Sequence, residues 1–226
     1  MEARPGGRDM DSSTELTLLH RGAEADLFTL VLARWKAVLK RRIRKTYRTA
    51  ELDVKIRRER TTREALAMHA AKRLGVRAPT LLEVNPEDCS IKMNFIDGVL
   101  ARNVIDPTSS SDSITIFENF GRQVGILHNG GIVHGDLTTS NVIIAPGFRT
   151  FMLDFGMSSH SDEIEDIGVD LHLFERSLAT THTRDTRAFM RAFSKVYRET
   201  VGSAQSQKSL KKAAVIARRG RYLALR

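Results

Sequence analysis

Short runs of apolar and β-branched residues, separated by polar turn residues, fill much of the first 96 positions of the chain. Five such runs predict β-strands: residues 16–19, 25–32, 36–40, 80–84 and 89–95. The first three are interrupted only by Arg21-Gly22-Ala23-Glu24 and by Arg34, which indicates an antiparallel meander. The turn-like sequence 85–88 joins the last two. The pattern therefore predicts a small five-stranded lobe.

A longer segment between the third and fourth runs favours a helix over residues 53–74. One apolar stripe of this helix is expected to be buried: Leu66, Ala70 and Leu74. Gly75, followed by Pro79, provides the stop signal. We expect this helix to belong to the same lobe as the strands.

At the turn signal Ile96-Asp97-Gly98 the pattern changes from strand to helix, which predicts a hinge between two lobes. Residues 106–112 are typical of a polar loop, and a helix is expected over residues 113–128. Its core stripe is formed by four apolar residues at helical spacing: Phe117, Phe120, Val124 and Leu127. Three more helices are expected: 167–178, 186–200 and a basic helix beyond Gln207.

These changes of pattern divide the chain into four parts. The polar, Gly/Pro-rich residues 1–14 are expected to form a mobile tail, residues 15–96 a strand-rich lobe, residues 97–204 a helical lobe and residues 205–226 a basic tail. With 226 residues and 41% hydrophobic composition, the chain is long enough for a sizeable core. We therefore expect an α+β fold with two small lobes.

Composition limits the setting in which such a chain works. No apolar run approaches the roughly 18 residues that span a bilayer, and the N-terminal sequence lacks the apolar block of a signal peptide. We expect neither export nor a membrane partner. The single cysteine, Cys89, cannot form an internal disulfide and fits the role of a small buried residue. A reducing cytoplasmic or nuclear setting is therefore expected.

Positive charge is concentrated in two segments. The chain has 36 Lys and Arg against 27 Asp and Glu, a formal net charge of +9. One cluster lies between residues 34 and 60: Arg41, Arg42, Arg44, Lys45, Arg48, Lys55, Arg57 and Arg58. The other follows Gln205 and contains no acidic residue: Lys208, Lys211, Lys212, Arg218, Arg219, Arg221 and Arg226. Such clusters can neutralise nucleic-acid phosphates, although a solvated surface would carry the same charges.

Two motifs carry the candidate chemistry: His134-Gly135-Asp136-Leu137-Thr138-Thr139-Ser140-Asn141 and Asp154-Phe155-Gly156. Asp136 and Asn141 are five positions apart (141 minus 136), as in the kinase pattern H-R-D-x-x-x-x-N. Phosphoryl transfer needs a carboxylate near the acceptor hydroxyl and oxygen ligands for Mg²⁺. Asp136 is therefore the candidate catalytic base, and Asn141 and Asp154 are candidate magnesium ligands. The alternative is a surface hairpin with a capping Asp and Asn.

An ATP site also needs a cation on the phosphates and a group that holds this cation. Lys40 ends the third predicted strand and matches the kinase V-A-I-K pattern. Its expected ion-pair partner on the next helix is Glu64, in preference to Glu51 or Glu59, because Glu64 lies next to the expected buried stripe.

The loop that contains Gly22, Ala23 and Glu24 occupies the place of a kinase Gly-rich phosphate loop but has a single glycine. Only Gly22 has the backbone freedom that lets N–H groups approach phosphates closely. We therefore expect nucleotide to bind without the tight cover of a protein kinase.

Two departures from the protein-kinase pattern affect the expected mechanism. Gly135 replaces the arginine that binds a phosphorylated activation loop in protein kinases, and Thr138 replaces a lysine near the transferred phosphate. Slow turnover is expected without that cation. The interval between Asp154 and Asp170 lacks A-P-E and leaves little room for a peptide-docking platform.

With these residues the chain resembles the PRPK-type family of small atypical kinases of the KEOPS (EKC) complex, which is related to the RIO kinases. The matching motifs cover nearly the whole chain: Gly22-Ala23-Glu24-Ala25, the Lys40 strand, Arg57 to Glu64, His134 to Asn141, Asp154-Phe155-Gly156, Gly168-Val169-Asp170-Leu171 and Arg219-Gly220-Arg221. The family implies a bilobal protein-kinase-like fold with a small β-rich N-lobe, one main helix and a reduced helical C-lobe.

The resemblance also implies roles for these residues. Asp136 is the catalytic carboxylate, Asn141 and Asp154 bind Mg²⁺, and Asp170 resembles the residue that braces the catalytic loop. Five residues are expected to contact or frame ATP: Gly22, Ala23, Glu24, Lys40 and Glu64.

The family's activity is that of an ATPase more than of a free-standing protein kinase, and it can autophosphorylate or phosphorylate protein serine and threonine. By resemblance, the chain supports the KEOPS catalytic subunit that makes threonylcarbamoyl-adenosine in tRNA. A small regulatory subunit is a second expected partner, and tRNA is expected to bind the basic surface and the C-terminal tail. The ending Tyr222-Leu223-Ala224-Leu225 departs from a purely basic tail.

Two other functions remain open at this point. A small-molecule phosphotransferase of the aminoglycoside or choline kinase type also uses H-G-D, but its larger C-lobe is hard to fit into 226 residues. A non-catalytic RNA-binding scaffold would need only the basic surface, and the complete set of Lys40, Asp136, Asn141 and Asp154 argues against it.

Overall fold

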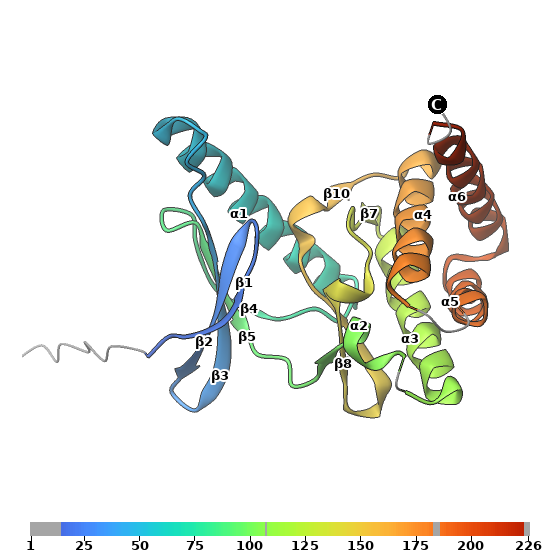
Figure 1. Ribbon diagram of the computed structural model, residues 1–226, viewed down its shortest axis with the longest axis horizontal. Helices are drawn as coiled ribbons and strands as arrows, with labels where there is room; N and C mark the ends of the chain where they lie inside the picture. The colour runs from blue at the N-terminus through green and yellow to red at the C-terminus, as the bar shows by residue number, and fades with distance from the viewer. Residues whose placement is uncertain (1–14, 107, 183–185, 224–226) are drawn as a thin grey trace, which may run out of the picture.

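The computed structural model has two lobes, a β-sheet with one long helix and a larger, mainly helical part (Figure 1). It describes residues 15–106, 108–182 and 186–223. The tail expected over residues 1–14 lies outside the described residues. The chain passes from the first lobe to the second between residues 95 and 98, where the sequence predicts a hinge. The α+β, protein-kinase-like architecture is that expected from the sequence.

Five antiparallel strands form the sheet of the N-terminal lobe: β1 (Thr17–Arg21), β2 (Ala25–Leu32), β3 (Trp35–Arg42), β4 (Leu81–Asn85) and β5 (Ser90–Asn94). Their order is β1-β2-β3-β5-β4, so the first three make the predicted meander. β3 continues two residues beyond Lys40, to Arg42. Because side chains alternate along a strand, Lys40 and Arg42 lie on the same face of the sheet.

The helix α1 (Ala50–Arg73) runs from the sheet toward the second lobe (Figure 1). The predicted buried stripe was wrong: Leu66 is 64% exposed and Leu74 is 41% exposed. The face toward the core instead carries Met68 together with small and polar residues: Thr61, Glu64, Ala65 and Ala71. Small side chains let the helix approach its neighbours closely. The spacing of the large apolar residues, taken alone, therefore predicted the wrong buried face.

Short elements lie between the two lobes. The strand β6 (Val99–Leu100) pairs with β8 (Val142–Ala145), which forms a hairpin with β9 (Arg149–Met152). β7 (Ile132–Val133) pairs with β10 (Ser159–His160). One helical turn, α2 (Ala101–Val104), and three 3₁₀ turns complete this region: Thr139–Asn141, Pro146–Phe148 and Phe155–Met157. The two-residue strands β6 and β10 were not predicted, because so few residues show no period.

Four helices build the C-terminal lobe: α3 (Ser110–Asn129), α4 (Ile164–Thr181), α5 (Thr186–Val201) and α6 (Ser203–Leu223). α3, α4 and α6 begin three or more residues earlier than predicted, because their first turns are polar. The loop expected over residues 106–112 therefore ends at Ser109, whose side chain accepts a hydrogen bond from the Asp112 N–H.

The core of this lobe forms where α3 packs on α5. All four residues of the predicted α3 stripe are buried: Phe117, Phe120, Val124 and Leu127. Phe120 also contacts Phe193 of α5, with ring centroids 5.7 Å apart. The two helices approach closely at Gly121, where a Cβ would lie 2.3 Å from the backbone oxygen of Phe193.

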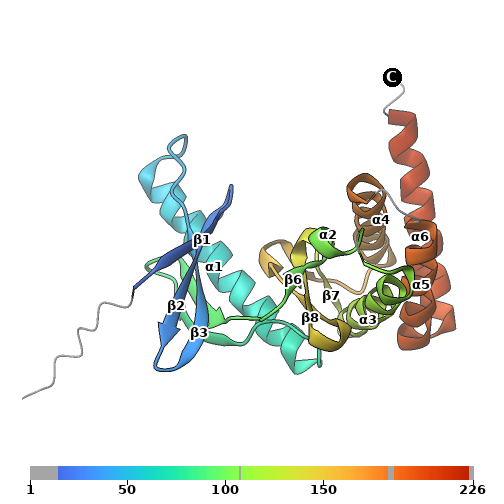
Figure 2. The same cartoon turned by 60° about the horizontal axis from the view of Figure 1, so that its bottom comes forward.

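The basic segment near the C-terminus is a helix that packs against α4 (Figure 2). Lys212 donates to Glu165 at 2.5 Å, and its aliphatic stem crosses Gly168. Ser206, Ser209 and Ala213 are buried. The boundary expected between residues 204 and 205 therefore falls inside α6, whose first half belongs to the packed lobe.

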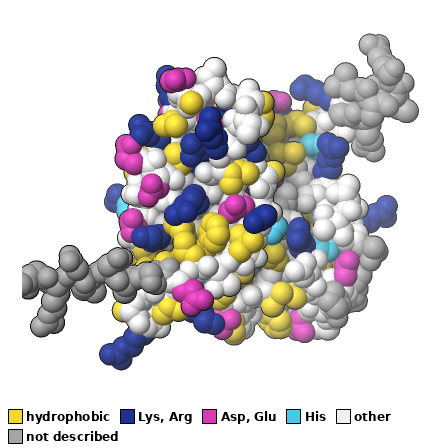
Figure 3. Space-filling view, turned by 60° about the vertical axis from the view of Figure 1, so that its left-hand side comes forward, with side chains coloured by type: hydrophobic (Ala, Val, Ile, Leu, Met, Phe, Trp, Pro, Cys, Tyr) yellow, Lys and Arg dark blue, Asp and Glu magenta, His cyan; other side chains and the backbone are white. Residues whose placement is uncertain are grey.

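The outer face of the N-terminal lobe mixes charge with apolar surface. Lysines and arginines lie between hydrophobic side chains on this side of the molecule (Figure 3). The first basic cluster is also less free than its composition suggests, because Arg42 pairs with buried Glu64, and Arg48 and Arg57 pair with buried Asp53. Among the described residues, no helix is long and apolar enough to cross a bilayer.

Gly121→Ala is expected to destabilise the fold by about 1–3 kcal/mol, because the new methyl group meets backbone that cannot rotate away. Arg122→Ala is the control, since Arg122 is an exposed residue of the same helix, next to Gly121. Alanine favours helix formation, so neither change weakens the helix itself. Thermal unfolding of the two variants measures the difference, and equal melting temperatures would contradict the close α3–α5 contact.

Candidate active site

Lys40, Glu64 and Asp154 meet between the two lobes, although they are far apart in the sequence. The Lys40 ammonium donates to Glu64 Oε1 at 2.6 Å and to Asp154 Oδ1 at 2.8 Å. Lys40 comes from β3, Glu64 from α1 and Asp154 from the residues that follow β9. Glu64 is 1% exposed, whereas half of the Asp154 side chain faces solvent. The ion pair between Lys40 and Glu64 expected from the sequence is therefore present.

Asp154 is held as a carboxylate. Burial alone would raise its pKa, but the charge of Lys40, the Lys40 hydrogen bond and the Gly156 N–H together keep the pKa of Asp154 below its usual value. Its backbone is left-handed, at φ 53°. This conformation turns the chain into the 3₁₀ turn Phe155–Met157, and Phe155 is fully buried.

The β8–β9 hairpin brings Asn141 close to Asp154. Asn141 precedes β8, and its backbone oxygen accepts a hydrogen bond from the Leu153 N–H at 2.9 Å, next to Asp154. The Asn141 amide donates to Asp136 Oδ2 at 2.8 Å. The three side chains assigned from the two sequence motifs therefore lie on one connected loop and hairpin.

His134 fixes the start of the catalytic loop, here residues 134–141. Its Nε2 lies 2.9 Å from the Leu153 backbone oxygen, and because a carbonyl oxygen can only accept, Nε2 carries the proton. Nδ1 is then free to accept from the Asp136 N–H at 3.3 Å. The ring thus ties the loop to the residue before Asp154.

Asp170 on α4 binds the same loop from the other side. Its carboxylate accepts hydrogen bonds from the backbone N–H groups of His134 at 2.7 Å and Gly135 at 2.9 Å, and from His128 Nε2 at 3.1 Å. His128 Nδ1 lies 3.0 Å from the Tyr197 hydroxyl. Burial raises the pKa of Tyr197 to about 12, so this hydroxyl stays protonated. Helices α3, α4 and α5 therefore all anchor the catalytic loop.

Gly135 is required by local geometry. Its φ is +78°, and a Cβ at this position would lie 2.4 Å from the Met157 backbone oxygen. An arginine cannot occupy this position without moving the loop or the turn after Asp154. The absence of the kinase arginine is therefore coupled to the close packing of residues 155–163 on the catalytic loop.

The predicted phosphate loop, Gly22-Ala23-Glu24, joins β1 to β2 and is held by hydrogen bonds and an ion pair within the N-terminal lobe. Gly22 N–H donates to the Ala25 backbone oxygen at 3.0 Å, and Lys45 donates to the Ala23 oxygen. The Glu24 carboxylate pairs with Arg60 of α1 at 2.8 Å. The Glu24 backbone oxygen also accepts a hydrogen bond from the Ile43 N–H at 3.2 Å, so Ala23 and Glu24 are held by neighbouring residues of the lobe.

The oxygen atoms around Asp154 suit Mg²⁺. Magnesium is commonly held by one or two protein groups together with water and substrate phosphates. The Asn141 amide donates its N–H groups to Asp136, which leaves its oxygen as a ligand, and Asp154 supplies a carboxylate kept ionised. Within the described ranges no group of three His, Cys, Asp or Glu side chains gathers as a metal site. Asn141 and Asp154 together offer the one or two protein oxygen ligands that Mg²⁺ commonly takes.

Sequence reasoning missed two parts of this site. Arg42, assigned to a basic surface cluster, is 7% exposed and donates to Glu64 Oε2 at 2.5 Å. Its position two residues after Lys40 on one strand was the available signal. His128 and Tyr197 were read only as helix residues, and nothing in their local sequence indicates a contact with Asp170.

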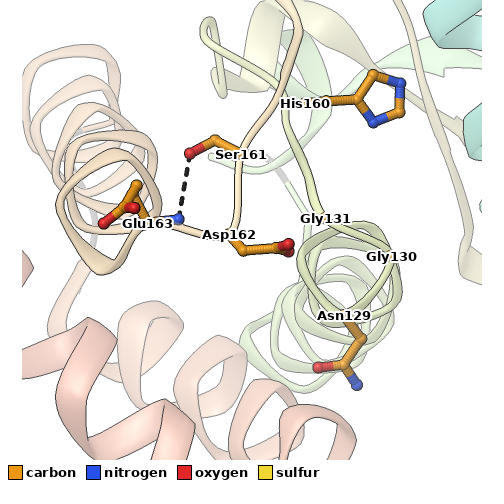
Figure 4. A pocket seen from close by; sticks show the side chains of 7 residues that line it. All are labelled: Asn129, Gly130, Gly131, His160, Ser161, Asp162 and Glu163. Atoms are coloured by element: carbon orange, nitrogen blue, oxygen red, sulfur yellow. Dashed lines mark hydrogen bonds between the residues drawn. The ribbon is translucent and has the colours of Figure 1, made fainter.

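A hollow of about 700 Å³ lies elsewhere, between the end of α3 and the start of α4 (Figure 4). Its walls carry polar groups: Asn129, Gly130, Gly131, His160, Ser161, Asp162 and Glu163. Ser161 accepts from the Glu163 N–H and caps the turn before α4. The hollow shares no residue with the Lys40–Asp154 cluster, so it is separate from the candidate active site.

Known proteins resemble this chain in sequence and in fold. A model of the RIO domain matches residues 27–203. The KEOPS complex subunit Bud32 of Pyrococcus abyssi is 37% identical over 216 residues, covering 92% of this chain and 96% of that protein. The Rio2 kinase of Chaetomium thermophilum has a similar fold, with a TM-score of 0.59 at 17% identity, covering 93% of this chain and 74% of that chain.

A second group of relatives is longer. The probable bifunctional tRNA threonylcarbamoyladenosine biosynthesis protein of Methanosarcina barkeri is 40% identical over 206 residues, which cover 91% of this chain and 35% of that protein. A Methanothermobacter thermautotrophicus protein of the same name is 39% identical over 180 residues, 79% of this chain and 32% of that protein. The chain therefore spans about a third of the bifunctional relatives.

Asp170→Asn is expected to destabilise the protein at pH 7 by about 2–3 kcal/mol, because hydrogen bonds to a buried charge are weakened. Burial alone would raise the pKa of Asp170, but His128 and the backbone N–H groups lower it. The unfolded chain therefore binds a proton near pH 4 while the native carboxylate does not, so this stabilisation is complete above about pH 4 and declines below it.

Urea unfolding between pH 7 and pH 3 measures this effect. Stability of the Asp170→Asn variant should fall less steeply below about pH 4 than that of the wild type. Asp88→Asn, in the exposed β4–β5 turn, is the control and should follow the wild-type curve. Parallel curves for wild type and Asp170→Asn would show that the carboxylate pKa is not lowered.

Proposed function

Because the chain belongs to the RIO domain family and to the family of the KEOPS complex subunit Bud32, we propose that it is an ATP-dependent phosphotransferase. We propose that it also has ATPase activity. The observation that carries the proposal is the double contact of the Lys40 ammonium with Glu64 and Asp154. Asp154 follows the β8–β9 hairpin that Asn141 precedes, and the Asn141 amide binds Asp136, so a phosphate-binding cation, a base and oxygen ligands for a metal are available together.

Each side chain has a proposed task in the transfer. Lys40 turns from Asp154 to the phosphate oxygens of ATP and keeps Glu64 as its anchor. Asp136 accepts the proton of the attacking hydroxyl or water, and the oxygen of that hydroxyl or water bonds to the γ-phosphorus. The bond from the γ-phosphorus to the oxygen that bridges it to the β-phosphate breaks, which releases ADP. Asn141 and Asp154 hold Mg²⁺, which neutralises the phosphate charge when it is bound.

We propose water as the main acceptor, with serine or threonine hydroxyls of this chain or another protein as slower ones. Only residues 155–163 separate Asp154 from α4, and β10 and a 3₁₀ turn occupy part of this interval. Gly135 leaves no arginine to bind a phosphorylated loop. These features support hydrolysis over recognition of an extended peptide.

The place of this activity is proposed from the relatives' names. We propose that the chain works within a KEOPS complex, beside its catalytic subunit and a small regulatory subunit, in support of tRNA threonylcarbamoyladenosine formation. Its near-complete match to the Bud32 relative and its match to one part of the bifunctional proteins support this role. The single buried cysteine agrees with a cytoplasmic or nuclear setting.

Asp136→Asn is expected to lower ATP turnover by at least about hundredfold, because the amide cannot accept the proton. The same change should abolish the stimulation of tRNA modification when the chain is mixed with its complex, tRNA and ATP. Asp154→Asn should raise the Mg²⁺ concentration needed for half-maximal turnover. Phosphate release and labelled threonylcarbamoyladenosine are the two measurements.

Asp88→Asn serves as the control for these variants, since Asp88 lies in the exposed β4–β5 turn. Full ATP hydrolysis and tRNA modification by Asp136→Asn would overturn the assigned chemistry. Rapid phosphorylation of an amino alcohol or an aminoglycoside, with no effect on tRNA modification, would favour the small-molecule phosphotransferase instead.

The outer face of α6 is the proposed tRNA contact. Lys208, Lys211 and Arg218 are exposed and lie on one stripe, with no ion-pair partner among the described residues. Lys212 and Arg219 instead pair with Glu165 of α4, so they serve the docking of α6. Arg221 and Arg226, also expected to bind tRNA, have side chains outside the described residues.

Changing Lys208, Lys211 and Arg218 together to Ala should weaken tRNA binding and reduce the slope of log affinity against log salt by about 2–3, since each phosphate contact contributes somewhat less than one unit. Lys92→Ala combined with Lys195→Ala removes charge from other elements and is the control. Titrations at several salt concentrations give the slopes. Identical slopes for the triple variant and the wild type would exclude this face.

A further inference from the structure

Glu64 has two cationic partners, one more than an ATP-site ion pair needs. Lys40 binds its Oε1 at 2.6 Å, and Arg42 binds its Oε2 at 2.5 Å. Arg42 is 7% exposed and also donates to the Arg60 backbone oxygen of α1 at 3.5 Å. Both oxygens of a buried carboxylate are therefore engaged by neighbouring residues of one strand.

This arrangement gives Glu64 a partner that does not depend on nucleotide. Lys40 shares its ammonium with Asp154, and it must turn to phosphate oxygens when ATP binds. Arg42 has no such second task, because the described hydrogen bonds of its side chain both go to α1. A buried carboxylate that loses its cations is strongly destabilised. Arg42 thus keeps Glu64, and with it α1, in place while Lys40 moves.

Arg42 also lies beside the turn that carries Asp154. A Cβ at Gly156 would lie 3.3 Å from the Arg42 guanidinium and 3.7 Å from Glu64 Oε2. Two cations and two carboxylates are therefore packed where β3, α1 and this turn meet. Met68 of α1 shares one apolar core with Leu137 and Phe155, and Arg42 adds a charged contact to this packing.

We propose that Arg42 is a positioning residue that locks Glu64 and α1 in the orientation required for phosphoryl transfer, so that the ATP site is assembled without a phosphorylated activation segment. The inference rests on the proposed function for its catalytic consequence. The docking of α1 by Arg42 is a separate, structural claim that can be tested without ATP.

The test compares Arg42→Met, Arg42→Lys and the wild-type chain by ATP hydrolysis and by hydrogen exchange of α1 without nucleotide. Arg42→Met should lower kcat about tenfold or more, because a misplaced Lys40 loses transition-state contacts, while KM for ATP changes about threefold or less. Exchange should rise selectively between residues 58 and 68. Arg42→Lys keeps the charge and should restore part of both properties.

Lys92→Met is the matched control, since it removes a lysine and its exposed ion pair with Glu83 from the same sheet. An Arg42→Met protein with wild-type kcat and wild-type α1 exchange would overturn the proposal. A uniform rise of exchange over the whole chain, with a lower melting temperature, would also overturn it, because that pattern marks a merely structural residue.

Failure of the proposed function gives a different result. Asp136→Asn and wild type would then hydrolyse ATP equally poorly, whereas the α1 exchange of Arg42→Met would still differ from wild type.

Discussion

The buried carboxylate of Glu64 is the constraint on which the site depends. A charge removed from water costs several kcal/mol unless it is paired and hydrogen-bonded, so α1 can dock only where β3 presents Lys40 and Arg42. This requirement fixes the rotation of α1 about its axis. It also explains why the core-facing side of the helix carries small residues, because the sheet and the turn after Asp154 must come close enough for these contacts.

A second buried carboxylate plays the same part in the other lobe. Asp170 gathers two backbone N–H groups of the catalytic loop and the ring of His128, and Tyr197 completes the network. The loop is therefore attached to three helices of the aromatic core. Asp170 holds the start of the catalytic loop, and Lys40, which pairs with Glu64, holds Asp154 after the β8–β9 hairpin. Hydrogen bonds therefore hold this part of the chain at both ends.

The reduced C-terminal lobe follows from this compact arrangement. The short interval between Asp154 and α4 packs directly on the catalytic loop, and at position 135 of this loop only glycine fits. The basic α6 covers α4 with part of its surface. Among its described lysines and arginines, Lys212 and Arg219 bind Glu165, and Lys208, Lys211 and Arg218 are exposed. Charge on this helix thus serves both folding and the proposed contact with tRNA.

Most elements could be read from the sequence, because alternation and helical spacing are local properties. The five strands, the α3 stripe and the last three helices followed from such patterns. The motifs around Asp136 and Asp154 could also be recognised from the sequence. Each motif is a short continuous run of residues, and one short hairpin joins the two. The ion pair of Lys40 with Glu64 was inferred from the kinase pattern that both residues match.

The tertiary structure decided which face of α1 is buried and which charges are free. Leu66 was expected in the core and is exposed, whereas Arg42 was expected on the surface and is buried. Burial of a residue depends on what packs against it, and a local sequence does not contain the size and charge of a neighbour more than twenty residues away. For the same reason, the contacts of Asp170 with His128 and Tyr197 became evident only when the helices were in place.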